Sequence, residues 1–135
     1  MIQMKTLLLF TALLAGFMSS ALAQDKSVEN QKFALLNNGA TVGMIIKSVM
    51  KFDQKRLSLT DVQLPRARQI ITTATVAFND GVKALKKAGM HPAKLRALAV
   101  TVEDEKVRQY KTILTPAQYQ ILAAGHKKTY PESRI

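Results

Sequence analysis

The chain of 135 residues contains no cysteine and no tryptophan, and it has only two histidines. The absence of cysteine excludes a disulfide scaffold, a cysteine-ligated zinc or iron–sulfur centre and a cysteine nucleophile. The length fits one small domain and excludes a multi-domain enzyme. Because 47% of the residues are hydrophobic, a wholly disordered chain is also excluded. Runs that alternate apolar and polar residues are missing as well, so no β-strands are predicted.

Acidic residues are scarce, and basic residues are plentiful. Twenty Lys and Arg stand against nine Asp and Glu, which gives a formal net charge of +11. A positive field of this kind speeds encounter with acidic partners and is screened by salt. A basic chain also permits nucleic-acid binding, but the tyrosines do not alternate with Lys or Arg as base-stacking platforms do. We therefore expect acidic or unfolded proteins as partners and no nucleic acid.

The first 23 residues have the three-part pattern of a secretory signal peptide. Lys5 supplies the positive start, Thr6–Met18 is an uncharged apolar run, and Ala21-Leu22-Ala23 matches an A-x-A cleavage site. The alternative is a retained membrane anchor, but the run is short for a hydrocarbon core, which needs about 20 residues. We predict cleavage near Ala23 and a periplasmic or secreted mature protein. Cleavage would remove one lysine and lower the net charge from +11 to +10.

Helical periodicity dominates residues 41–125. Apolar residues recur at spacings of three and four in segments that begin near Thr41, run from Arg66 to Lys87, open at Pro92, and run from Pro116 to about Ala124. The third segment has Lys106 on its otherwise apolar inward face. The sequence predicts an all-α fold, a small helical hairpin or bundle of three longer helices and one short helix. A chain this small has only packing to hold it together, which favours a dimer.

The two flanks of this helical domain are expected to be less ordered. Residues 24–40 are polar with an Asn37-Asn38-Gly39 turn cluster, and they predict a loose N-terminal arm. Residues 126–135 are basic and contain Pro131, and they predict a disordered tail.

A five-residue pattern, L-T-x-x-Q, occurs twice, 55 residues apart. Thr at the N-cap accepts a hydrogen bond from the backbone N–H three residues on, and Gln at the third helical position reaches back to the cap's own N–H. Leu before the cap can pack on the residue at the fourth helical position. Pro65 disturbs the first copy, so either its first turn is distorted or the helix begins nearer Leu64. The six motif residues are Leu59, Thr60, Gln63, Leu114, Thr115 and Gln118.

Two such motifs in a small, basic, cysteine-free, exported helical chain resemble the Spy/CpxP family of periplasmic stress proteins. The resemblance covers roughly residues 41–124. It implies all-α hairpins that pair into thin, curved homodimers. It also implies a role in envelope stress, either as an ATP-independent chaperone that holds unfolding clients on a basic, partly apolar concave face or as an accessory of an envelope sensor protein. Other relatives are linked to zinc and nickel. The motif residues would have a structural role.

Basic side chains near the first motif are the candidates for client binding. Lys47, Lys51 and Lys55 recur every four residues and so form a row along one helix face. The alternative for this row is an ordinary solvated face. Methionines beside it offer adaptable apolar contacts. The full set of candidates is Met44, Lys47, Met50, Lys51, Lys55, Arg56, Arg66 and Arg68.

Metal binding and catalysis receive little support from the sequence. His91 and His126 are the weak metal candidates, and one histidine per region falls short of the three or four protein ligands that zinc needs. His91 fits better as a helix cap before Pro92, and His126 as a tail residue. No triad, H-E-x-x-H motif or phosphate loop is present, so we expect neither an enzyme nor a cofactor. A metal-linked sensor and a module that binds an anionic envelope surface remain alternatives.

Overall fold

The computed structural model describes residues 25–135, and this range contains five helices and no strand. The signal peptide predicted over residues 1–23 lies outside the described residues. The helices are α2 (Asp25–Glu29), α3 (Val42–Leu57), α4 (Leu64–Ala88), α5 (Pro92–Lys111) and α6 (Pro116–Thr129). The predicted all-α fold is therefore confirmed. α6 is longer than expected because it continues past Ala124 to Thr129.

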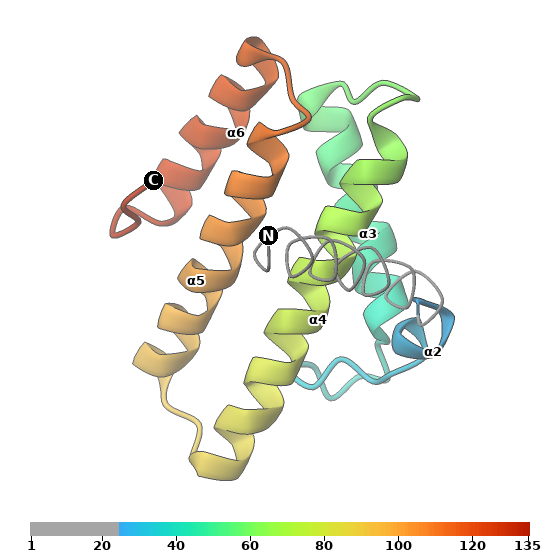
Figure 1. Cartoon of the computed structure of the whole chain (residues 1–135). Helices are drawn as coiled ribbons and strands as arrows, with labels where there is room; N and C mark the ends of the chain where they lie inside the picture. Colours follow the sequence, from blue (N-terminus) through green and yellow to red (C-terminus); the bar gives the residue numbers. More distant parts are fainter. Residues whose placement is uncertain (1–24) are drawn as a thin grey trace, which may run out of the picture.

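The long helix α4 is the centre of the arrangement. It packs against α3 on one side and against α5 on the other, and α6 lies beside α5 (Figure 1). The α3–α4 turn and the α5–α6 turn lie at the same end of the molecule, and the α4–α5 turn lies at the opposite end. The fold thus brings together the two turns that carry the L-T-x-x-Q motifs.

The apolar core follows the spacing expected for amphipathic helices. Each of the four long helices contributes buried residues from one face, so that the helices share one continuous cluster. The main core residues are Phe33, Val42, Ile46, Leu57, Ala67, Ile70, Ile71, Val107, Tyr110 and Leu122.

A buried polar cluster connects α3 to α5 inside this core. The carboxylate of Asp53 is fully buried, and it accepts a hydrogen bond of 2.8 Å from the Tyr110 hydroxyl. The Lys106 ammonium, itself 7% exposed, lies 3.2 Å from the same carboxylate, and Arg56 Nε donates to it at 2.9 Å. All the strongly polar groups of the cluster are therefore paired, as buried charges require. The lysine predicted on the inward face of α5 has its counter-charge on α3.

Alkaline pH should weaken the fold through Tyr110. Burial, and then the neighbouring Asp53 carboxylate, raise the pKa of Tyr110 far above its ordinary value of about 10. Above about pH 10 the unfolded tyrosine loses its proton while the folded one keeps it, so the free energy of unfolding falls by up to about 1.4 kcal/mol per pH unit. Below that pH this contribution is fully present. Urea denaturation between about pH 9 and 11 should show the wild-type advantage over Tyr110→Phe shrinking; a constant difference would contradict this.

The N-terminal arm is not loose, contrary to the sequence prediction. Phe33 is buried and stacks on Phe78 of α4 with ring centroids 6.0 Å apart. Asn79 of α4 holds the arm on both sides, because its Oδ1 accepts from the Ala34 N–H at 2.8 Å and its Nδ2 donates to the Lys32 carbonyl at 3.3 Å. The residues of the arm alone do not indicate these contacts with α4, because the arm has the composition of a loop.

The prediction of a disordered tail over residues 126–135 is also wrong. His126 to Thr129 form the last turn of α6, and Tyr130–Ile135, here called the strap, fold back against α5 and α6. Arg96 of α5 pairs with the Glu132 carboxylate at 2.6 Å and donates to the Thr129 carbonyl. Tertiary contacts with α5 thus order a segment whose own composition favours disorder.

Candidate functional site

The second motif forms the predicted capping box at the start of α6. Thr115 Oγ1 accepts from the Gln118 N–H at 3.2 Å, and Gln118 Oε1 accepts from the Thr115 N–H at 2.9 Å. Pro116 occupies the first turn, where a missing N–H costs nothing. The start of α6 is therefore capped by residues of its own motif alone.

The first motif makes the same two bonds although it stands one turn before its helix. Thr60 Oγ1 accepts from the Gln63 N–H at 3.3 Å, and Gln63 Oε1 accepts from the Thr60 N–H at 3.0 Å. α4 itself begins at Leu64, with Pro65 inside its first turn. The effect predicted for Pro65 is therefore observed. Because α4 starts at Leu64, Pro65 falls in the first turn, where a missing backbone N–H breaks no helical hydrogen bond.

The two motif glutamines also bind one another, which the sequence did not predict. Gln63 Nε2 donates to Gln118 Oε1 at 2.8 Å, and Gln118 Nε2 donates to Gln63 Oε1 at 3.0 Å. The second N–H of each amide reaches a backbone carbonyl before the other motif, Ile113 for Gln63 and Leu57 for Gln118, both at 3.0 Å. This glutamine pair therefore joins the two turns at one end of the bundle with uncharged hydrogen bonds.

The outer face of α3 is the candidate binding surface. Its buried residues fall on one side, and Lys47, Lys51 and Lys55 lie exposed on the other. Two large apolar side chains are exposed with them, Met44 at 59% and Phe52 at 62%. We call Lys47, Lys51 and Lys55 the lysine row. The sequence reading missed Phe52 as a surface residue, because it placed this position at the fraying end of the helix.

Acidic side chains do not neutralise the lysine row within residues 25–135. Ion pairs in this range join Arg56 and Lys106 to Asp53, and they join Arg68, Arg96 and Arg108 to glutamates. None of the ion pairs involves Lys47, Lys51 or Lys55. The acidic groups in these ion pairs are thus engaged by other basic side chains, and Lys47, Lys51 and Lys55 lie exposed on α3.

The other predicted client-binding residues are not all gathered on this face. Met50 is half-buried and packs against the core. Arg56 is held by Asp53, with its guanidinium 4.9 Å from the centre of the Phe52 ring. On α4, Arg66 donates to Gln69 at 3.1 Å, and Arg68 pairs with Glu29 of α2. Among these candidates, Met44 and the lysine row are exposed and have no ion pair or side-chain hydrogen bond within the part of the chain that the structure describes.

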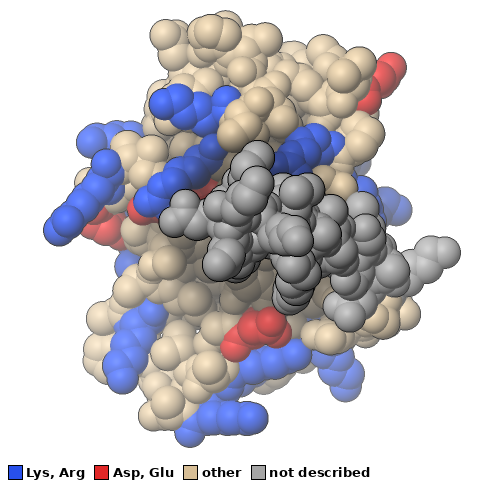
Figure 2. Space-filling model, viewed as in Figure 1, with Lys and Arg blue, Asp and Glu red and all other residues tan. Residues whose placement is uncertain are grey.

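Basic side chains are widely spread over the molecule. On the face shown in Figure 2, Lys and Arg lie at several separate places, and acidic side chains interrupt them at few points. Net charge alone therefore does not mark a site. The α3 face is distinguished by three exposed lysines at fixed helical spacing beside exposed apolar groups, and none of the three pairs with an acid among the described residues.

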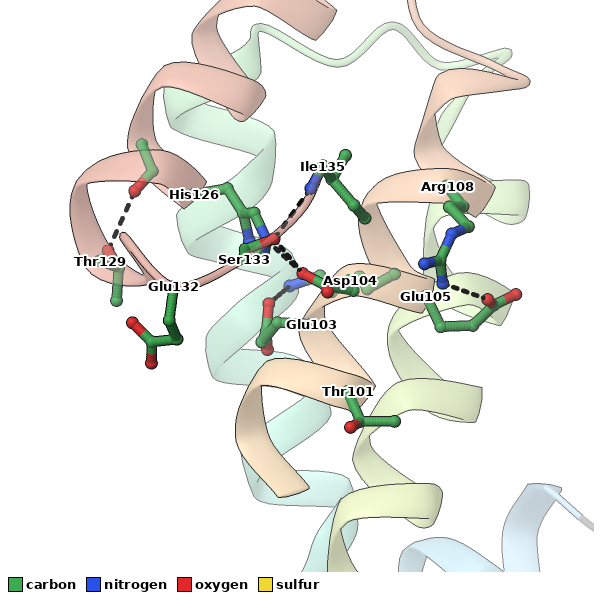
Figure 3. A network of polar contacts seen from close by, with 12 residues as sticks. Thr101, Glu103, Asp104, Glu105, Arg108, His126, Thr129, Glu132, Ser133 and Ile135 are labelled. Atoms are coloured by element: carbon green, nitrogen blue, oxygen red, sulfur yellow. Dashed lines mark hydrogen bonds and ion pairs between the residues drawn. The ribbon is translucent and has the colours of Figure 1, made fainter. Parts of the chain in front are cut away.

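The two histidines lie far apart in different roles. His91 caps α5 as predicted, accepting from the Ala93 N–H through Nδ1 at 3.2 Å. His126 is buried rather than part of a free tail, and its Nε2 lies 2.6 Å from Asp104 Oδ1 and 3.1 Å from Ser133 Oγ (Figure 3). Among residues 25–135 no three His, Asp or Glu side chains are placed to share a metal ion.

Asp104, His126 and Ser133 do not form a nucleophilic relay. Asp104 and Ser133 both contact the same ring nitrogen, Nε2, and the serine hydroxyl donates to the Asp104 carboxylate at 2.6 Å. A Ser–His–Asp relay needs the carboxylate on one ring nitrogen and the serine on the other. The cluster therefore binds the strap and has no activated nucleophile. The sequence predicted no site role for Asp104 or Ser133.

No helix in the described range is both long enough and apolar enough to cross a membrane. Comparisons of the chain with protein-family models, with curated proteins and with solved structures found no match.

Proposed function

We propose that this protein is an exported, ATP-independent chaperone-like or envelope stress-response protein that binds unfolded or acidic clients through the outer face of α3. The observation that carries the proposal is the lysine row, exposed and without acidic partners in the described range, next to Met44 and Phe52. Unfolded chains present both carboxylates and apolar side chains. A surface that offers ammonium groups and two apolar side chains together matches that chemistry.

Rigidity of the α3 face supports the same proposal. The helix is anchored from behind by Asp53 and by core residues, so the lysines are held at successive turns, about 6 Å apart along the axis. Long-range attraction brings an acidic chain to this face, and the apolar side chains then add short-range contact. High salt screens the first contribution and leaves the second.

The direct test is suppression of client aggregation without ATP. The triple variant Lys47→Gln, Lys51→Gln and Lys55→Gln should lose most of the suppression that the wild type shows at low salt. Its matched control is Lys87→Gln, Lys94→Gln and Lys128→Gln, which removes the same charge from exposed positions elsewhere. Equal loss in both variants would mean that net charge alone acts, and no suppression by the wild type would reject the proposal.

Export, kinship with the Spy/CpxP family and a homodimer belong to the same proposal. Export rests on the signal pattern of residues 1–23, and kinship rests on two L-T-x-x-Q turns of matching geometry. Mass spectrometry of protein recovered from the periplasm should find a mature chain that begins at Gln24.

Light scattering during size exclusion measures the oligomeric state, and a monomer at micromolar concentration would remove the dimer from the proposal.

A further inference from the structure

The end of the bundle opposite the two motif turns is formed by two segments that are distant in the sequence. Residues 31–36 of the N-terminal arm lie beside the last turns of α4, because Lys86 Nζ donates to the Ala34 carbonyl. Leu35 comes directly after Ala34, and Met90 comes four residues after Lys86, in the α4–α5 turn. The arm and this turn therefore share one end of the molecule (Figure 1), here called the basic end.

Lysines crowd this end, and acidic residues are missing from the segments that form it. Residues 31–40 and 81–95 contain no Asp or Glu, and the nearest acid along α4 is Asp80. The ion pairs found within residues 25–135 involve none of the lysines of these segments. Lys and Arg side chains are visible at this end, at the bottom of the view in Figure 2. The exposed lysines are Lys32, Lys83, Lys86, Lys87 and Lys94.

Helix stability explains only part of this charge. Lys86 and Lys87 lie in the last turn of α4, where the helix dipole favours cations. Lys94 lies in the first turn of α5, where the dipole disfavours a cation, and no acidic residue accompanies it in that turn. Lys32 lies in the irregular arm and supports no helix. The charge at this end is therefore larger than the fold itself requires.

Apolar side chains are exposed among these lysines. Leu35 is 39% exposed, and Leu36 and Met90 are each 42% exposed. All three lie on irregular chain rather than on a helix face that could pack against another helix. Exposed apolar groups rimmed by charge mark a surface that meets a partner or a membrane. Lysine is a point charge on a flexible stem, so it can follow phosphates that hold no fixed position.

We propose that the basic end binds the surface of anionic phospholipid bilayers, with its lysines at the headgroup phosphates and with Leu35, Leu36 and Met90 inserted between the headgroups. Basic clusters of about four to eight residues are of the size that recognises anionic lipid. Buried apolar area and electrostatic attraction add together in such binding. A bilayer offers both chemistries in one plane and demands no matching shape. This surface is separate from the lysine row of α3, so the inference does not depend on client binding.

The lack of tryptophan in the chain allows a direct test of which end inserts. Leu36→Trp places an indole at the basic end, and Val62→Trp places one in the α3–α4 turn at the opposite end, where Val62 is 90% exposed. Vesicles of equal parts phosphatidylglycerol and phosphatidylcholine should shift the emission of Leu36→Trp to shorter wavelength and leave that of Val62→Trp unchanged. Vesicles of phosphatidylcholine alone should shift neither. Equal shifts in both variants, or a shift in neither, overturn the inference.

Sedimentation with the same vesicles tests the role of the lysines. The triple variant Lys32→Gln, Lys87→Gln and Lys94→Gln should bind up to about a hundredfold more weakly, because each lysine near an anionic bilayer contributes about fivefold. Its matched control replaces the lysine row by glutamine and should weaken binding by a few-fold at most. Every sample has the same N-terminus, so residues 1–23 contribute equally.

Two results of this comparison would reject the membrane. Equal weakening in the two triple variants would mean that net charge alone attracts the protein to the vesicles. Binding of soluble polyglutamate, but not of vesicles, through the lysines of the basic end would assign this surface to an acidic protein instead.

Discussion

Replacing Asp53 by alanine is expected to lower the free energy of unfolding by about 3–5 kcal/mol, the cost of removing one partner from a buried ion pair. Lys106 is 7% exposed and would lose its counter-charge at 3.2 Å, which leaves the Glu103 carboxylate at 4.0 Å. The Tyr110 hydroxyl, in a fully buried side chain, would lose its acceptor as well. Urea denaturation monitored by circular dichroism measures the loss.

Two further variants separate the origin of this loss. Asp80→Ala removes the same charge from an exposed position on α4, and it should change stability by less than about 0.5 kcal/mol. The triple variant Asp53→Leu, Lys106→Met and Tyr110→Phe replaces the three buried members of the cluster by apolar groups, while Arg56 is 27% exposed and can reach water, so the variant should recover most of the stability. If the triple variant is as unstable as Asp53→Ala, the loss comes from packing and the electrostatic explanation is wrong.

Replacing Gln118 by alanine should cost about 2–3 kcal/mol. This amide accepts from Thr115 and Gln63, and it donates to Gln63 and to the Leu57 carbonyl. Each of these hydrogen bonds contributes about 1 kcal/mol net to stability. Because the partners are only partly buried, water replaces some of the lost bonds in the variant. Thermal and urea unfolding should both show the loss, and Gln120→Ala on the exposed face of α6 should show almost none.

A double-mutant cycle tests whether the two turns act as one unit. Gln63→Ala removes the same reciprocal bonds from the other side, so the two substitutions together should cost less than their sum, with a coupling energy of about 1 kcal/mol. Gln118→Glu keeps the shape and the bond from the Thr115 N–H, but a carboxylate cannot donate to Leu57 or to Gln63. Its stability should therefore be close to that of Gln118→Ala. Additive losses in the cycle would contradict the pairing.

The features set by neighbouring residues were predictable from the sequence. The helices follow the apolar periodicity, Thr115 and Gln118 form the expected box, and Pro65 displaces the start of α4 as proline should. The burial of Asp53 also left a signal, because it lies three residues after Met50 and four before Leu57 on the inward stripe of α3. That signal was overlooked because aspartate is rarely fully buried without a partner.

The features set by contacts between distant residues were not predictable in this way. Gln63 and Gln118 are 55 residues apart, and neither motif alone indicates that its glutamine faces the other. The strap has the composition of a disordered tail, and it is ordered by Arg96 and Asp104 from α5. The exposure of Phe52 likewise depends on which side of α3 the other helices cover.

The reciprocal amide pair has a consequence for how this sequence can change over generations. A substitution at either Gln63 or Gln118 leaves the other amide with two bonds to replace, so drift at one position alone is disfavoured. Related chains should retain both glutamines or exchange both for another matched couple. The pair is also neutral, so adaptation to brine or to an acid habitat can remodel the surface charge without disturbing this joint.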